Sequence, residues 1–187
     1  MLSLYGRDEW ETVDMVYTDL PQSTEHILHP ERYFDSDQPI EVKIPDLEAS
    51  LGDTWRVIGS DVLGEFQLKM ILQEYFGPLG AMEAAEGWGG DGYILLHNDS
   101  QNADVLILKT TWDDQDESDE FWDLFRTAMY HRTAYFERID TLVGELPMRA
   151  WVGDLNSILA QQNGLDVNIS IGPDIELLEI IMNAMSQ

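Results

Sequence analysis

Two histidines and the acids around them are the residues best suited to chemistry. His26 and His29 lie three residues apart, beside Glu25. Residues at this spacing share a face of a helical turn, so both imidazoles could reach one metal ion, with a distant carboxylate such as Glu65 as a further ligand. The pattern therefore gives a hypothesis of zinc or another divalent cation held by His26, His29, Glu25 and Glu65. In the preferred interpretation the protein has no cofactor, and these imidazoles form hydrogen bonds with backbone groups or carboxylates.

An acidic run at residues 113–120 superficially resembles a calcium-binding loop. It lacks the glycine at the sixth position and the bidentate glutamate at the twelfth that such loops use. Acids also favour the start of a helix, where they cap free N–H groups and meet the positive end of the helix dipole. The run therefore predicts a helix N-terminus in front of an apolar stripe that begins at Phe121.

The glycine-rich stretch 87–93 is the other conspicuous pattern. It follows a predicted helix and precedes a predicted strand, whereas a dinucleotide-binding loop follows a strand and opens a helix. We therefore expect a turn here, with Trp88 either buried or at the rim of a ligand site. Nucleophilic catalysis has no motif, because no serine lies in a Gly-x-Ser-x-Gly context and the chain has no cysteine. No catalytic residue is assigned.

Composition narrows the classes of partner. The chain has 187 residues, with 36 acids against 10 bases and a net charge of −26. Such a surface repels phosphate backbones and anionic lipids, which argues against nucleic-acid and membrane-surface binding. The acidity indicates adaptation to high salt, a solubilising outer face, or a cation or basic protein partner. The absence of cysteine excludes disulfides and thiolate metal sites.

No apolar run approaches the length of a membrane span, and the N-terminus carries no signal-peptide pattern, so the default expectation is a cytoplasmic protein. Hydrophobic periodicity then predicts the elements that position the candidate residues. Helices are expected in the segment ending before Pro21 and at 26–29, 63–76, 78–86, 121–130 and 175–185, and strands at 41–44, 55–60, 93–96, 105–112, 148–152, 155–161 and 165–171. The order predicts an α+β fold in which an antiparallel sheet has helices packed mainly on one face. We expect a single domain over 1–187, with 1–40 as a helical N-terminal extension and 41–187 as the core.

Two motifs together resemble a known family. Segment 21–33, PQSTEHILHPERY, resembles the signature P-x-STEQ-x-x-HPE-[KR]-Y, and 87–93, GWGGDGY, resembles GWGGDRY. An ordered match over about residues 5–125 resembles the C-terminal portion of poorly characterised bacterial and archaeal proteins described as zinc peptidases. His26 stands where that family has Gln, and Gly92 where it has Arg. The positions that carry the motifs are Ser23, Thr24, Glu25, His29, Pro30, Tyr33, Gly87, Trp88, Gly89, Gly90, Asp91 and Trp112.

The resemblance implies a non-catalytic half, because the family's His-Glu-x-x-His helix precedes these motifs and is not found in this sequence. It also implies an extracytoplasmic location, against the default above. The first functional hypothesis is thus a binding or structural module, an accessory domain that holds a protein partner or joins a larger assembly. The alternative is a metal-dependent hydrolase with His26 and His29 as ligands.

Overall fold

The computed structural model describes residues 2–133, 136–143 and 146–186. Within these residues the strands are β1 (Trp55–Asp61), β2 (Trp88–Asn98), β3 (Ala103–Trp112), β4 (Glu137–Val143), β5 (Leu146–Val152), β6 (Ser157–Asn163) and β7 (Asp166–Gly172). They form one antiparallel sheet in the order β1-β2-β3-β7-β6-β5-β4. β2 and β3 are the predicted central hairpin, and β4 lies in a stretch for which the sequence predicted no element.

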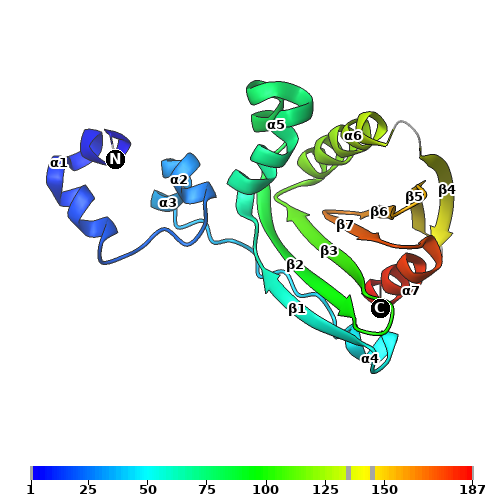
Figure 1. The fold of residues 1–187 in the computed structure, drawn as a ribbon. Coiled ribbons are helices and arrows are strands. Elements are labelled where there is room, and N and C mark those ends of the chain that lie inside the picture. Colours follow the sequence, from blue (N-terminus) through cyan, green and yellow to red (C-terminus); the bar gives the residue numbers. More distant parts are fainter. Residues whose placement is uncertain (1, 134–135, 144–145, 187) are drawn as a thin grey trace.

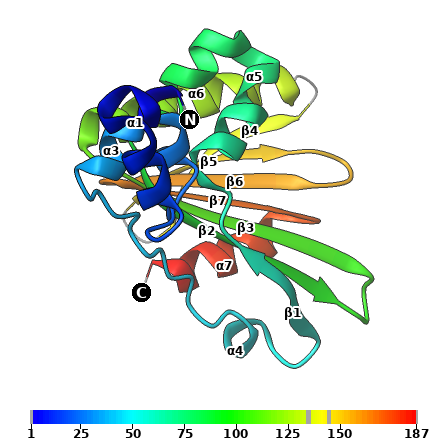
Figure 2. The ribbon, with the colours of Figure 1, turned by 90° about the vertical axis from the view of Figure 1, so that its left-hand side faces the viewer.

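The helices are α1 (Leu2–Val16), α2 (Glu25–Leu28), α3 (Pro30–Phe34), α4 (Glu48–Leu51), α5 (Gly64–Glu83), α6 (Gln115–Arg132) and α7 (Ile175–Met185). The two longest, α5 and α6, share one face of the sheet, and α7 lies on the other (Figures 1 and 2). The predicted α+β class, with an N-terminal helical segment ahead of the sheet, is confirmed. None of the described helices is long and apolar enough to cross a membrane.

The sheet is apolar on both faces because its central strands carry two interleaved apolar sets. In β3, Leu108 and Trp112 pack with α5 and α6, whereas Val105 and Ile107 pack with α7. Successive side chains of a strand point to opposite faces, so an almost continuous apolar run fills both layers. The interior of the fold is therefore a sheet between two helical layers.

Helix boundaries follow local chemistry. The Asp114 side chain accepts hydrogen bonds from the backbone N–H groups of Asp116 (2.9 Å) and Glu117 (3.0 Å), so the acidic run is the N-terminus of α6, as predicted. α5 is kinked at Gly77, which has a φ of 68° and directly precedes Pro78. The kink lies at the break that the sequence predicts between two helical segments.

Two sequence predictions are wrong and share one cause. Residues 88–92 are not a turn but the first part of β2, and residues 41–44 are extended but belong to no strand. The Ile40 N–H donates to the Gly89 carbonyl at 2.7 Å, and a Cβ on Gly90 would lie 2.2 Å from the Ile40 carbonyl oxygen. The glycines therefore let the segment around Ile40 lie directly against β2, and only Gly87, with φ of 73°, has the backbone conformation of a glycine turn.

The N-terminal extension lies on the side of the molecule that carries α5 and the β1 edge of the sheet (Figure 1). Its first helix, α1, is interrupted by non-helical backbone at Asp8 and Glu9. Of the apolar stripe that predicts this helix, Val13 is buried, whereas Trp10 and Tyr17 remain 66% and 71% exposed. The extension thus contributes an exposed aromatic surface as well as the first motif.

Candidate functional site

The two motifs meet at the start of α5, where Asp91 is the central residue. Its carboxylate accepts the backbone N–H groups of Leu63 and Gly64, both at 2.7 Å, and the indole N–H of Trp88 at 2.9 Å. The first N–H groups of a helix have no partner within the helix, so Asp91 caps α5 from a neighbouring strand. Burial raises the pKa of Asp91 above its usual range, and the three hydrogen bonds oppose that rise.

Thr24 of the first motif holds the same helix start. Its Oγ1 accepts the backbone N–H of Phe66 at 3.2 Å. A Cβ on Gly64 would lie 2.5 Å from this hydroxyl oxygen, so glycine at that position permits the close approach. Residues 24 and 91, far apart in sequence, therefore satisfy N–H groups of the same helix start.

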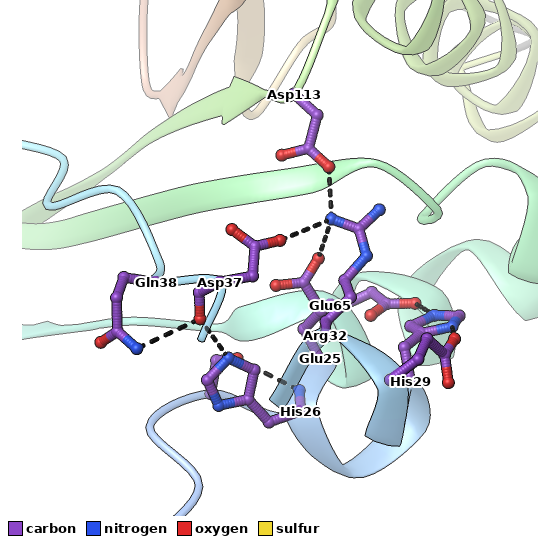
Figure 3. A network of polar contacts seen from close by, with 10 residues as sticks. Glu25, His26, His29, Arg32, Asp37, Gln38, Glu65 and Asp113 are labelled. Atoms are coloured by element: carbon purple, nitrogen blue, oxygen red, sulfur yellow. Dashed lines mark hydrogen bonds and ion pairs between the residues drawn. The ribbon is translucent and has the colours of Figure 1, made fainter. Parts of the chain in front are cut away.

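A partly buried ion-pair network ties the extension to the core (Figure 3). The Arg32 Nη1 lies 2.9 Å from Glu25 Oε1, 3.3 Å from Asp37 Oδ2 and 2.5 Å from Asp113 Oδ2. Asp113 follows β3, so Arg32 joins the first motif to the sheet. Glu25 is 3% exposed, and this burial raises its pKa to about 7 despite the attraction of Arg32.

His26 is held by backbone groups on both ring nitrogens. Nδ1 accepts the Gln22 backbone N–H at 3.3 Å, and Nε2 lies 2.6 Å from the Asp37 carbonyl oxygen. Because an N–H can only donate and a carbonyl can only accept, the imidazole carries its proton on Nε2. Neither nitrogen has a lone pair left for a metal ion in this arrangement.

His29 bonds a different partner. Its Nε2 lies 2.8 Å from Glu65 Oε1, and its Nδ1 lies 3.6 Å from Glu31 Oε1. Glu65 is 1% exposed, and this burial raises its pKa while the hydrogen bond to His29 lowers it. The second carboxylate oxygen, Oε2, is buried and has no hydrogen-bond partner.

The metal-site residues are therefore only partly brought together. The structure joins His29 to Glu65, pairs Glu25 with Arg32 and ties His26 to the backbone. Within the described ranges, no group of three or more His, Asp or Glu side chains could hold a metal ion. The residue that sequence reasoning missed is Arg32, although one signal was available. It is one of only two bases between residues 21 and 50, inside a motif crowded with acids.

The remaining residues of the first motif also make local contacts. The Ser23 hydroxyl accepts the His26 backbone N–H at 3.3 Å, and the Tyr33 hydroxyl donates to the Asp19 carbonyl at 2.7 Å. Pro30 occupies the first turn of α3, where its missing N–H is no loss. These contacts shape the extension into a compact unit.

The tryptophans of the second region are core residues. Trp88 and Trp112 face each other across the β2–β3 ladder and are 1% and 0% exposed. The Trp112 ring stacks on Phe121 of α6 at 4.4 Å between centroids, and its indole N–H donates to Thr110 Oγ1 at 3.1 Å. Trp88 is thus buried, and it also contributes to the lining of a cleft.

A cleft of about 550 Å³ lies between the extension and the core. Its walls come from the first motif, from the extended segment around Ile40 and from the connection between β1 and α5. Ile27, Ile40 and Val62, one from each wall, are 68%, 50% and 52% exposed. The lining includes Glu41 and Asp91 and contains no base among the described residues.

Fold and site together define an α+β domain in which two sequence motifs fix an N-terminal extension against a core of one sheet between helical layers. The chain belongs to the family described as domain of unknown function DUF8575, whose model matches residues 54–182. The match covers the sheet, the helices α5 and α6 and most of α7, and the first motif lies outside it. No curated protein matches the chain.

Proposed function

We propose that the protein is a non-catalytic interaction module, an accessory domain that binds a basic, apolar segment of a protein partner in the cleft between extension and core. One observation carries the proposal. The polar side chains of the motifs bond to one another and to the backbone, and these contacts fix the walls of the cleft rather than face a reacting group.

The cleft has the chemistry of a binding groove. Three aliphatic side chains from separate segments, Ile27, Ile40 and Val62, are exposed along it, and such convergence is uncommon on a surface that has no partner. An apolar side chain inserted between them would remove all three from water. Burying one aliphatic side chain contributes about 1.5–3 kcal/mol, so three anchors contribute roughly 4.5–9 kcal/mol, part of which offsets the free-energy cost of association.

Charge selects the partner. The chain carries 36 acids and 10 bases, and the described charged residues of the cleft lining are the exposed Glu41 and the buried Asp91, whose carboxylate already accepts three N–H groups. A partner segment with lysine or arginine beside its apolar anchors is attracted, whereas an acidic segment is repelled. This complementarity favours a basic partner over a second copy of this chain.

The alternative, a metal-dependent hydrolase built on His26 and His29, has weaker support. His26 uses both ring nitrogens in bonds to the backbone, and His29 and Glu65 satisfy each other. Resemblance of the motifs to the non-catalytic half of zinc peptidases agrees with the module.

Selection from a random peptide library tests the proposal and requires no named partner. We expect the enriched peptides to combine aliphatic or aromatic anchors with lysine or arginine, and to bind more weakly as salt is raised. The variant Ile27→Asp should weaken their binding about tenfold or more, because a charge replaces an apolar contact.

Leu79→Asp is the matched control, since Leu79 of α5 is 74% exposed and lies outside the cleft. It should leave the affinity of the selected peptides unchanged. Enrichment of acidic peptides, or equal weakening by both variants, would contradict the proposed site.

A further inference from the structure

A second cleft, of about 280 Å³, lies between α6 and the far edge of the sheet. Arg126 and Tyr130 of α6, Arg138 of β4, and Arg149 and Trp151 of β5 line it. It shares no residue with the first cleft, so its ligand is independent of the function proposed above.

The concentration of positive charge here is unusual for this chain. Three of its ten bases line this one cleft, against 36 acids in the whole sequence. The lining contains one acid, Asp123, whose carboxylate pairs with the Arg126 guanidinium. Guanidinium groups gathered in one depression make it a favourable place for an anion.

Two of these arginines, Arg126 and Arg138, have N–H donors for which the structure shows no hydrogen-bond acceptor among the described residues. The Arg138 guanidinium lies over the Tyr130 ring at 4.0 Å, and among the side chains that the structure describes none forms an ion pair with it. Stacking uses the flat face of a guanidinium and leaves the N–H donors at its edge available. The Nε of Arg126 is buried without a hydrogen-bond partner, so the protein alone does not satisfy this side chain either.

We propose that this cleft binds a small organic anion through a carboxylate or phosphate group. Guanidinium forks match the paired oxygens of these two groups, and no neutral ligand would offset the clustered charge as well. Tyr130, which is 56% exposed, places an aromatic side chain beside the arginines, and the nearly buried Trp151 also lines the cleft. Benzoate and phenyl phosphate have the required chemistry and serve as probes.

Titration of the full chain with each probe, followed by NMR at about 0.15 M salt, tests the site. We expect saturable binding of at least one probe, with the indole N–H signal of Trp151 shifting more than those of the other tryptophans. The relative affinity of the two probes distinguishes a carboxylate from a phosphate ligand.

Arg138→Gln should weaken the binding of the preferred probe about tenfold or more, because it removes a charge-assisted contact from an exposed position. Arg56→Gln removes the same charge at a distant site, where Arg56 pairs with Asp99 at 3.0 and 3.2 Å, and should change the affinity less than about twofold. Absence of saturable binding of both probes up to roughly 10 mM, or equal weakening by the two variants, would overturn the proposal.

Discussion

The variant Asp91→Ala is expected to lose at least about 3 kcal/mol of unfolding free energy, because three buried donors lose their acceptor at once. The donors are the N–H groups of Leu63, Gly64 and Trp88, and Asp91 itself is 2% exposed. Urea denaturation followed by tryptophan fluorescence measures the loss. The same change should loosen the first cleft, since Leu63 and Gly64 line it.

Asp99→Ala serves as the control for Asp91. Asp99 also makes two hydrogen bonds, to Arg56, but its side chain is 65% exposed. Exposed ion pairs contribute about 0–1 kcal/mol, so this variant should stay close to the parent protein. If the two aspartate variants lost similar small amounts of unfolding free energy, the central role of Asp91 at the start of α5 would be refuted.

The second large effect is a pH dependence centred on Glu25. Burial raises the pKa of this carboxyl from 4.5 to about 7, so the folded protein holds a proton that the unfolded chain releases. The stabilisation that this proton provides is complete below pH 4.5 and is lost as the pH rises through 7. The contribution is on the order of 3 kcal/mol.

Glu25→Gln should therefore flatten the dependence of unfolding free energy on pH between about 5 and 8. Arg32 keeps Asp37 and Asp113 as partners in this variant, so the change does not leave a buried cation unpaired. Denaturant titrations at several pH values measure the effect. Glu31→Gln, at a side chain that is 65% exposed, is the control and should run parallel to the parent protein. A parallel profile for Glu25→Gln as well would contradict the assigned role of Glu25.

Much of the fold could be predicted because its signals are local. The strand at 105–112, the capped start of α6 and the break between Gly77 and Pro78 each depend on residues close in sequence. The prediction of a turn at 87–92 was wrong because the absence of a side chain at glycine has two possible structural consequences. It permits a turn, and it also permits another segment to lie close, as Ile40 does over Gly90.

The candidate site was less predictable because its geometry depends on distant and backbone groups. Spacing places His26 and His29 on one turn. It does not show that the His26 ring is hydrogen-bonded on both nitrogens, to the Gln22 N–H and the Asp37 carbonyl. The bond between His29 and Glu65 spans 36 positions and arises only when α5 packs against the first motif. Sequence reasoning selected most of the polar residues of the two motifs but not Arg32, and their structural roles became visible only in the folded chain.

The most direct measurement of the central claim is calorimetric titration of the purified, metal-stripped protein with zinc, alongside the double variant His26→Ala/His29→Ala. If the motif residues serve to join the extension to the core, the parent protein and the variant should show the same weak, non-stoichiometric heats. One tightly bound zinc per chain that disappears in the double variant would contradict the account and support the hydrolase alternative.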